Sequence, residues 1–154
     1  MRSRNFLPLI GLLALIMAAC QAAPGSVPEN RLDSGGADLT RIHESNGVRV
    51  AVTPLNLNTP GDTLEFEVAL DTHTRDLDFD LAALAFLRTD RGEEVRALAW
   101  DGGRGGHHLR GRLFFPSRDP TGLALIREGV HVLELILRDV DGAPEHSFRW
   151  EVSP

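Results

Sequence analysis

The residues best suited to chemistry lie in two short segments of the chain. The first segment, 70–80, contains His73 among four aspartates, and the second, 100–108, places four glycines ahead of the adjacent His107 and His108. Each segment follows a predicted strand, so both are expected to form loops at the ends of a β-sheet domain. The candidate metal ligands in these loops are His73, His107, His108, Asp71 and Asp101.

Three imidazoles together with carboxylates could bind a transition metal such as copper or zinc. Neighbouring residues of a strand point to opposite faces of the sheet, so His107 and His108 cannot both turn inward unless the chain bends there. Counting back from Leu109 places His107 on the core face. Regular geometry therefore offers His73 and one histidine of the adjacent pair as a minimal metal site.

Calcium is a competing ion in the first loop. The carboxylates of Asp76, Asp78 and Asp80 alternate along the chain, and calcium prefers oxygen ligands of this kind. The segment lacks the glycine and the distal glutamate of a helix-loop-helix calcium site. Copper or zinc is therefore the metal that the sequence favours, with calcium as the lesser alternative.

A purely structural role is the alternative for the same residues. Asp71 or Asp101 could accept a hydrogen bond from His73 or His107 and tie the two loops together. Trp100 also has two interpretations, because an aromatic residue in a strand is usually buried. An exposed Trp100 beside the glycine-rich loop could instead form a platform for a carbohydrate or a peptide.

The sequence contains no motif of a known catalytic chemistry. Its serines stand outside the strand-turn-helix context of a hydrolase nucleophile. The glycine-rich stretch 102–106 is followed by neither a helix nor a lysine, as a phosphate-binding loop would require. We therefore expect no enzymatic activity.

The start of the chain resembles the signal of a bacterial lipoprotein. A basic start precedes an apolar run from Phe6 to Met17, and small residues lead to Cys20, the single cysteine. The stretch 16–20 is similar to the lipobox of that family, although Met17 stands where leucine is usual. The resemblance implies cleavage before Cys20, diacylation of its sulfur and acylation of the new amino terminus.

Two other interpretations of this start are weaker. Ordinary secretory cleavage needs small residues at the first and third positions before the cut. Cleavage positions just after Cys20 do not meet this requirement, because Cys20 or Gln21 occupies one of the two places. A transmembrane helix needs about 20 apolar residues, and the run here has only about 14. Gln21 resembles the outer-membrane sorting signal of enteric bacteria, so we expect a lipid anchor on the periplasmic face of a membrane, preferably the outer one.

The mature chain expected from this cleavage is acidic. Removal of residues 1–19 takes away two of the 16 basic residues and none of the 22 acidic ones, which leaves a formal charge of −8. Such a domain lacks the basic surface that binding to nucleic acid or anionic lipid requires. Because no second cysteine is present, the exported domain must be stabilised by its core without an internal disulfide.

Three regions are predicted along the chain: a signal peptide (1–19), a lipidated flexible tether (20–45) and a folded domain (46–154). The tether is predicted because its residues are small and polar, with few regularly spaced apolar side chains, although residues 39–42 could begin an early strand. His43 is expected to be solvated within it. His131 and His146 are expected at the core edge, where each begins a strand.

The folded domain is predicted to be all β. Apolar and polar residues alternate, and in the last strand Trp150 is expected to face inward while Arg149 and Glu151 face outward. A helical turn is expected near 77–82. Strands are predicted at 48–52, 64–70, 83–88, 94–100, 107–115, 123–126, 130–138 and 148–152. Seven or eight short strands separated by turns indicate a single antiparallel, immunoglobulin-like β-sandwich, and its charged edge strands favour a monomer.

Taken together, residues 71–73, Trp100 and residues 105–108 are similar to small exported domains of bacteria. That resemblance spans 48–152 and implies an exported β-domain without indicating an activity. Two functions are predicted. The first is a lipid-anchored envelope binding module that holds copper or zinc through its loop histidines. The second is a non-catalytic domain that interacts with another envelope protein, in which the histidines only fix the loops.

Overall fold

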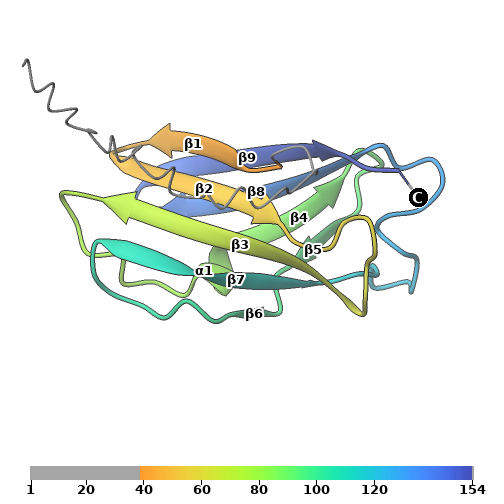
Figure 1. Cartoon of the computed structure of the whole chain (residues 1–154), viewed down its shortest axis with the longest axis horizontal. Helices are drawn as coiled ribbons and strands as arrows, with labels where there is room; N and C mark the ends of the chain where they lie inside the picture. Colours follow the sequence, from red (N-terminus) through yellow and green to blue (C-terminus); the bar gives the residue numbers. More distant parts are fainter. Residues whose placement is uncertain (1–38, 154) are drawn as a thin grey trace, which may run out of the picture. The chain divides into compact units, whose positions relative to one another are not determined.

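The computed structural model describes residues 39–153, which form two antiparallel β-sheets packed face to face (Figure 1). The first sheet has the order β1-β2-β3-β7-β6 and the second the order β5-β4-β8-β9. The strands of the first sheet are β1 (Arg41–Ser45), β2 (Val48–Pro54), β3 (Thr63–Thr72), β7 (His108–Pro116) and β6 (Ala99–Trp100). Those of the second are β5 (Glu94–Arg96), β4 (Ala85–Thr89), β8 (Val132–Val140) and β9 (Ala143–Glu151). The predicted all-β antiparallel sandwich is confirmed.

The core forms from the inward-facing residues of both sheets. On β3, Leu64, Phe66, Val68 and Leu70 are fully buried, and the residues between them lie on the outer face. Phe66 meets Trp150 of the opposite sheet with ring centroids 5.4 Å apart. Burying each large apolar side chain contributes roughly 1.5–3 kcal/mol, so this alternation drives the two sheets together.

Two local predictions are confirmed at the ends of strands. Asp141 and Gly142 reverse the chain between β8 and β9 with φ angles of 48° and 77°, values that a two-residue hairpin turn requires. Asp80 begins the short helix α1 (Leu81–Leu84) by accepting a hydrogen bond from the backbone nitrogen of Ala82 at 3.1 Å. The helical turn therefore exists, a few residues later than predicted.

The prediction of one strand over 94–100 is wrong. β5 pairs with β4 in the second sheet, whereas β6 pairs with β7 in the first. Leu98 lies between them and is 62% exposed where the chain crosses from one layer to the other. The predicted strand at 123–126 is also absent, because this stretch makes only an isolated bridge between Arg118 and Ala124.

The predicted boundary between tether and folded domain is wrong as well. β1 pairs residue for residue with β2, so the tether does not extend to Ser45 and the folded domain does not start at residue 46. In β1, the apolar side chain points away from the core and polar side chains point to the core side, the reverse of the usual arrangement in a strand. Ile42 faces outward and is 56% exposed, whereas Arg41 and His43 stand opposite buried valines of β2. This inversion hides the strand from an analysis of alternating hydrophobicity.

The predicted signal peptide, its cleavage site and Cys20 lie outside the described residues. Within 39–153, no helix is both long enough and apolar enough to cross a membrane. Both predicted loops and all five candidate metal ligands lie inside the described part of the chain.

Candidate functional site

The two predicted loops lie against each other at one end of the sandwich. The backbone nitrogen of Leu77 donates to the carbonyl of Gly106 at 3.0 Å, and that of Gly105 donates to the carbonyl of Leu77 at 3.0 Å. The side chain of Asp76 accepts a further bond from the backbone nitrogen of Gly106. Gly105 and Gly106 have φ angles of 83° and 90°, which residues with a side chain rarely adopt. The glycines thus permit the close backbone pairing of the loops.

His107 joins the two loops from an exposed position. Its Nδ1 lies 2.5 Å from the carbonyl oxygen of Arg75, so Nδ1 carries the proton and donates it. Its own carbonyl accepts a bond from the backbone nitrogen of Thr72 at 2.9 Å. The prediction that His107 shares the core face is wrong, because β7 begins at His108 and its alternation does not extend back to His107.

His108 and Asp71 form a pair on the outer face of the first sheet, where β7 and β3 place them opposite each other. Nδ1 of His108 lies 2.8 Å from one oxygen of Asp71, and the guanidinium of Arg49 lies 3.7 Å from the other oxygen. The ring of His73 stands edge-on to that of His108, with centroids 6.5 Å apart. The structure therefore brings His73, His108 and Asp71 to one place on the surface.

The five candidate metal ligands do not form one coordinating set. Across residues 39–153, no group of three or more histidine, cysteine, aspartate or glutamate side chains is placed to hold a metal ion. Asp101 instead accepts a bond from the backbone nitrogen of Arg112 at 2.5 Å. His107 bonds to a carbonyl, as described above. The geometry thus resembles the predicted structural alternative, with different pairs: His108 with Asp71, and His107 with a backbone oxygen.

The aspartates considered for calcium make separate contacts. Asp76 binds the backbone of the glycine-rich loop, while Asp80 begins α1 and lies 3.2 Å from the guanidinium of Arg104. A shared calcium ion would need their oxygens to converge within its coordination sphere. These contacts give the calcium alternative no geometric support.

Trp100 lies over its own loop. Its indole nitrogen donates to the carbonyl of Gly103 at 2.8 Å, and a side chain at Gly102 would overlap the indole ring. The residue is partly buried against the core. The side of the ring that covers the backbone of this loop is therefore not available to the predicted carbohydrate or peptide platform.

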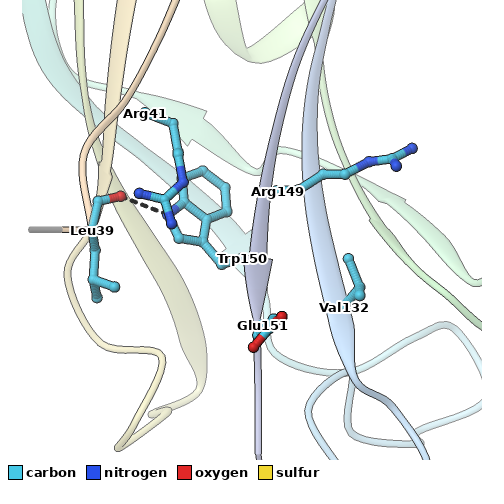
Figure 2. Close-up of a pocket in the computed structure, with 6 residues that line it drawn as sticks. All are labelled: Leu39, Arg41, Val132, Arg149, Trp150 and Glu151. Carbon is cyan, nitrogen blue, oxygen red and sulfur yellow. Dashed lines mark hydrogen bonds between the residues drawn. The ribbon is translucent and has the colours of Figure 1, made fainter. Parts of the chain in front are cut away.

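A cleft of about 500 Å³ lies beside β9 (Figure 2). This volume falls within the range of small-molecule sites, about 300–1,000 Å³. Figure 2 shows Leu39 beside Trp150, Arg41 drawn across the indole ring, and the guanidinium of Arg149 directed away from both. The residues that line the cleft come from the beginning of the described chain and from β8 and β9: Leu39, Arg41, Val132, Arg149, Trp150 and Glu151.

Trp150 fixes one wall of the cleft. Its side chain is 2% exposed, and its indole nitrogen donates to the carbonyl of Leu39 at 2.6 Å, the bond drawn in Figure 2. This bond joins the second sheet to Leu39, two residues before β1 begins. The wall therefore combines a rigid buried aromatic ring with an edge strand of the opposite sheet.

Arg149 is held beside the cleft by a buried carboxylate. Glu134 on β8 is 5% exposed and accepts bonds from Arg149 at 2.8 Å, Arg88 at 2.7 Å and Ser147 at 2.5 Å. Burial alone would raise the pKa of Glu134, but the hydrogen bonds from Ser147, Arg149 and Arg88 outweigh it and lower the pKa to about 2. The stability that this carboxylate contributes is therefore complete above its ordinary pKa of 4.5 and is lost as the pH falls from 4.5 towards 2.

The sequence analysis missed the cleft because its two sides lie far apart in the chain. The outward positions of Arg149 and Glu151, and the inward position of Trp150, were predicted and are confirmed. Nothing in the sequence pattern placed Arg41 beside them, since β1 was assigned to the tether. The Asn46-Gly47 pair, with φ angles of 51° and 78°, is the turn signal that could have revealed the β1–β2 hairpin.

Comparison with protein-family models gives no match for the chain, and comparison with curated proteins gives none. Among solved structures, the chain is similar to the crystal structure of a DUF4426 family protein from Pseudomonas aeruginosa PAO1. The two share 12% sequence identity with a TM-score of 0.42, over 75% of this chain and 96% of that chain. A similarity of this degree carries no information on function.

Proposed function

We propose that the chain is a lipid-anchored, non-catalytic binding protein of the bacterial cell envelope, and that the cleft beside β9 takes a small ligand carrying a carboxylate. The composition of the cleft carries this proposal. Two arginines, Arg41 and Arg149, line the cleft together with the apolar side chains of Leu39, Val132 and Trp150. Guanidinium groups bind carboxylates through charge-assisted hydrogen bonds, often two at a time. A carboxylate next to a short apolar group, as at the C-terminus of a peptide, matches both features.

The state of Arg149 supports the proposal. Arg149 donates to Glu134 from Nε, and a guanidinium carries four further N–H groups on its two terminal nitrogens. The bond to Glu134 fixes the side chain before a ligand arrives, which reduces the entropy lost on binding. Arg41 donates to the carbonyl of Thr40 at 3.2 Å and is one of the residues that line the cleft.

Export and anchoring are the sequence-based part of the proposal. The lipobox resemblance ends at Cys20, the single cysteine of the chain. Several acyl chains on that residue would hold the protein on a bilayer, because each buried methylene contributes about 0.8 kcal/mol. A partner in the same envelope, either a free acid or the C-terminus of a neighbouring protein, would then meet the cleft.

We expect the full-length protein in detergent to bind a short peptide that ends in an apolar residue with a free carboxylate. The Kd should be below about 1 mM, and the C-terminally amidated peptide should bind at least about tenfold more weakly, because a hydrogen bond to a charged group is worth about 1.5–3 kcal/mol. Isothermal titration calorimetry with both peptides measures this difference. A propionate titration shows whether a free acid suffices without the peptide.

Two arginine variants control this experiment. Arg41→Gln should weaken binding of the acidic peptide by about tenfold or more, through loss of a charge-assisted bond. Arg110→Gln should leave binding unchanged, because Arg110 lies on the outer face of the first sheet beside Glu67. Equal affinity for the two peptides, or equal effects of the two substitutions, would rule out the cleft as a carboxylate site.

A second candidate is a transition metal held by the loop histidines. The observation that favours it is the bond between Asp71 and Nδ1 of His108, because carboxylates commonly orient metal-binding imidazoles in this way, and His73 lies beside the pair. Titration of the same protein with Cu²⁺ and Zn²⁺ tests it. Binding tighter than about 10 µM that is lost in His73→Ala and retained in His131→Ala supports this candidate, and no binding removes it.

A further inference from the structure

Two histidines outside both loops meet at the edge of the sandwich where β1 packs against β9. Nδ1 of His43 lies 3.1 Å from Nδ1 of His146, and their rings are edge-to-face with centroids 4.9 Å apart. His146 is fully buried in the middle of β9, and His43 projects from β1. The prediction that His43 lies in a tether is therefore wrong, although its side chain is exposed as expected. The prediction that His146 begins a strand is also wrong.

The contact between these nitrogens has room for only one proton. Nδ1 of one ring must donate and Nδ1 of the other must accept. Nε2 of His146 is buried without a hydrogen-bond partner, so a proton on that nitrogen would be an unpaired buried donor. The favoured arrangement therefore has a neutral His146 whose proton lies on Nδ1 and is donated to His43. Burial, followed by the neighbouring His43, lowers the pKa of His146 from 6.5 to about 4.

Among the described residues, no carboxylate faces the two rings, and the solvent reaches the exposed His43 but not the buried His146. The acids adjacent along the strands, Glu44 and Glu145, stand opposite Arg49 and Arg138 rather than facing the histidines. On the same side of β1 as His43 lie Arg41, a further positive charge, and Ser45, which is uncharged. The side chains directly opposite or packed on the two rings are apolar: Val50 of β2, Leu137 of β8 and Phe148 of β9.

The attachment of β1 to the sandwich depends on polar contacts. None of the residues of β1 belongs to the buried apolar core. The strand is held by its hydrogen bonds to β2, by the bond from Trp150 to the carbonyl of Leu39, and by the histidine pair. The segment just before it adds a bond between the hydroxyls of Thr40 and Thr53 and the packing of Leu39 against the core. β1 is also an edge strand, so its loss would leave the β2-β3-β7-β6 pairing intact.

We propose that His43 and His146 form an acid-sensitive clasp that holds β1 on the sandwich and releases it when both imidazoles are protonated. Two protonated rings would direct like charges and N–H groups at each other across the 3.1 Å contact, with no acceptor between them. Moving β1 away separates the charges and admits water to His146. The edge of β2 and the side chains of Phe148 and Trp150 would then be uncovered.

Release of β1 would also take apart the cleft, because Leu39 and Arg41 line it. A ligand bound there through its carboxylate would then be released at acidic pH. This consequence rests on the proposed function. The release of β1 itself does not depend on any ligand. It can therefore be measured on the protein alone, and its failure is distinguishable from a failure to bind peptide.

The fluorescence of Trp150 reports on the clasp in a full-length Trp100→Phe protein, where Trp150 is the single indole. Lowering the pH from about 7.5 to about 4 should shift its emission to longer wavelength and at least double its quenching by acrylamide, because the bond to Leu39 is lost and water enters. His146→Leu and His146→Phe should each abolish this transition. His131→Leu should leave it unchanged, since His131 precedes β8 and is exposed.

Hydrogen exchange of the unmodified full-length protein gives an independent result. After correction for intrinsic rates, the amides of β1 and of the facing edge of β2 should lose at least about tenfold protection in acid, while β3 and β7 keep theirs. Equal loss of protection throughout both sheets would overturn the proposal, as would an acid transition that persists in both His146 variants. Zn²⁺ that raises the thermal midpoint of the parent but not of His146→Leu would show instead that the pair is a metal site.

Discussion

Replacing Trp150 by alanine is expected to lower the free energy of unfolding by about 3–5 kcal/mol, the usual cost of removing a large buried aromatic side chain. Its ring is 2% exposed and packs against Phe66 of the opposite sheet. The substitution would leave a cavity between the two sheets and would deprive the carbonyl of Leu39 of its donor. Chemical denaturation of the full-length protein, followed by circular dichroism, measures the loss.

Trp100→Ala is the matched control for this prediction. The ring of Trp100 is only partly buried and lies over its own loop, where the bond from its nitrogen to Gly103 is local. Less surface is removed from the core, so the loss should be less than half of that for Trp150→Ala. An equal decrease in the free energy of unfolding in the two variants would contradict the description of Trp150 as a core residue that also forms a wall of the cleft.

Replacing Gly111 by alanine is expected to cost about 3 kcal/mol or more, through overlap that the surroundings cannot relieve. Gly111 lies within β7, and a Cβ atom there would overlap the backbone of Gly102 and come 2.6 Å from a carboxylate oxygen of Asp101. The loop cannot retreat easily, because Asp101 exchanges two hydrogen bonds with Arg112. Thermal and chemical unfolding both report this loss.

Gly61→Ala provides the comparison, since no atom lies within 4 Å of a Cβ at that position and its φ angle is not positive. Its effect on the free energy of unfolding should stay within about 0.5 kcal/mol. A similarly small effect for Gly111→Ala would mean that the glycine-rich loop does not lie on β7. In that case the arrangement of His107 and His108 described above would also be in doubt.

The sandwich could be predicted because its central strands alternate cleanly. In β3 the apolar side chains from Leu64 to Leu70 all face the core, so their period of two has one interpretation. β1 could not be predicted in the same way, because Arg41 and His43 stand opposite buried valines of β2 but are themselves exposed, and Ile42 is exposed too. Backbone hydrogen bonds to β2 hold this strand in place. Such bonds do not depend on the side chains, so a hydrophobicity pattern does not reveal them.

The candidate site was predicted in part. The sequence correctly indicated that the segments around His73 and His107 are loops, and the alternative of histidine–aspartate ties anticipated the type of contact found between His108 and Asp71. The particular pairs depend on the register of β3 against β7, which the sequence does not contain. The cleft depends on bringing Arg41 to β9, which only the folded chain accomplishes.

The proposed function requires that the folded domain be exported and held on a membrane through Cys20. Intact-mass and N-terminal peptide mass spectrometry of the protein purified from its own membranes tests this requirement most directly. We predict an amino-terminal Cys20 that carries diacylglycerol on its sulfur and an acyl chain on its amino group. A protein that still begins at Met1, or that carries an unmodified thiol at Cys20, would contradict the function proposed here.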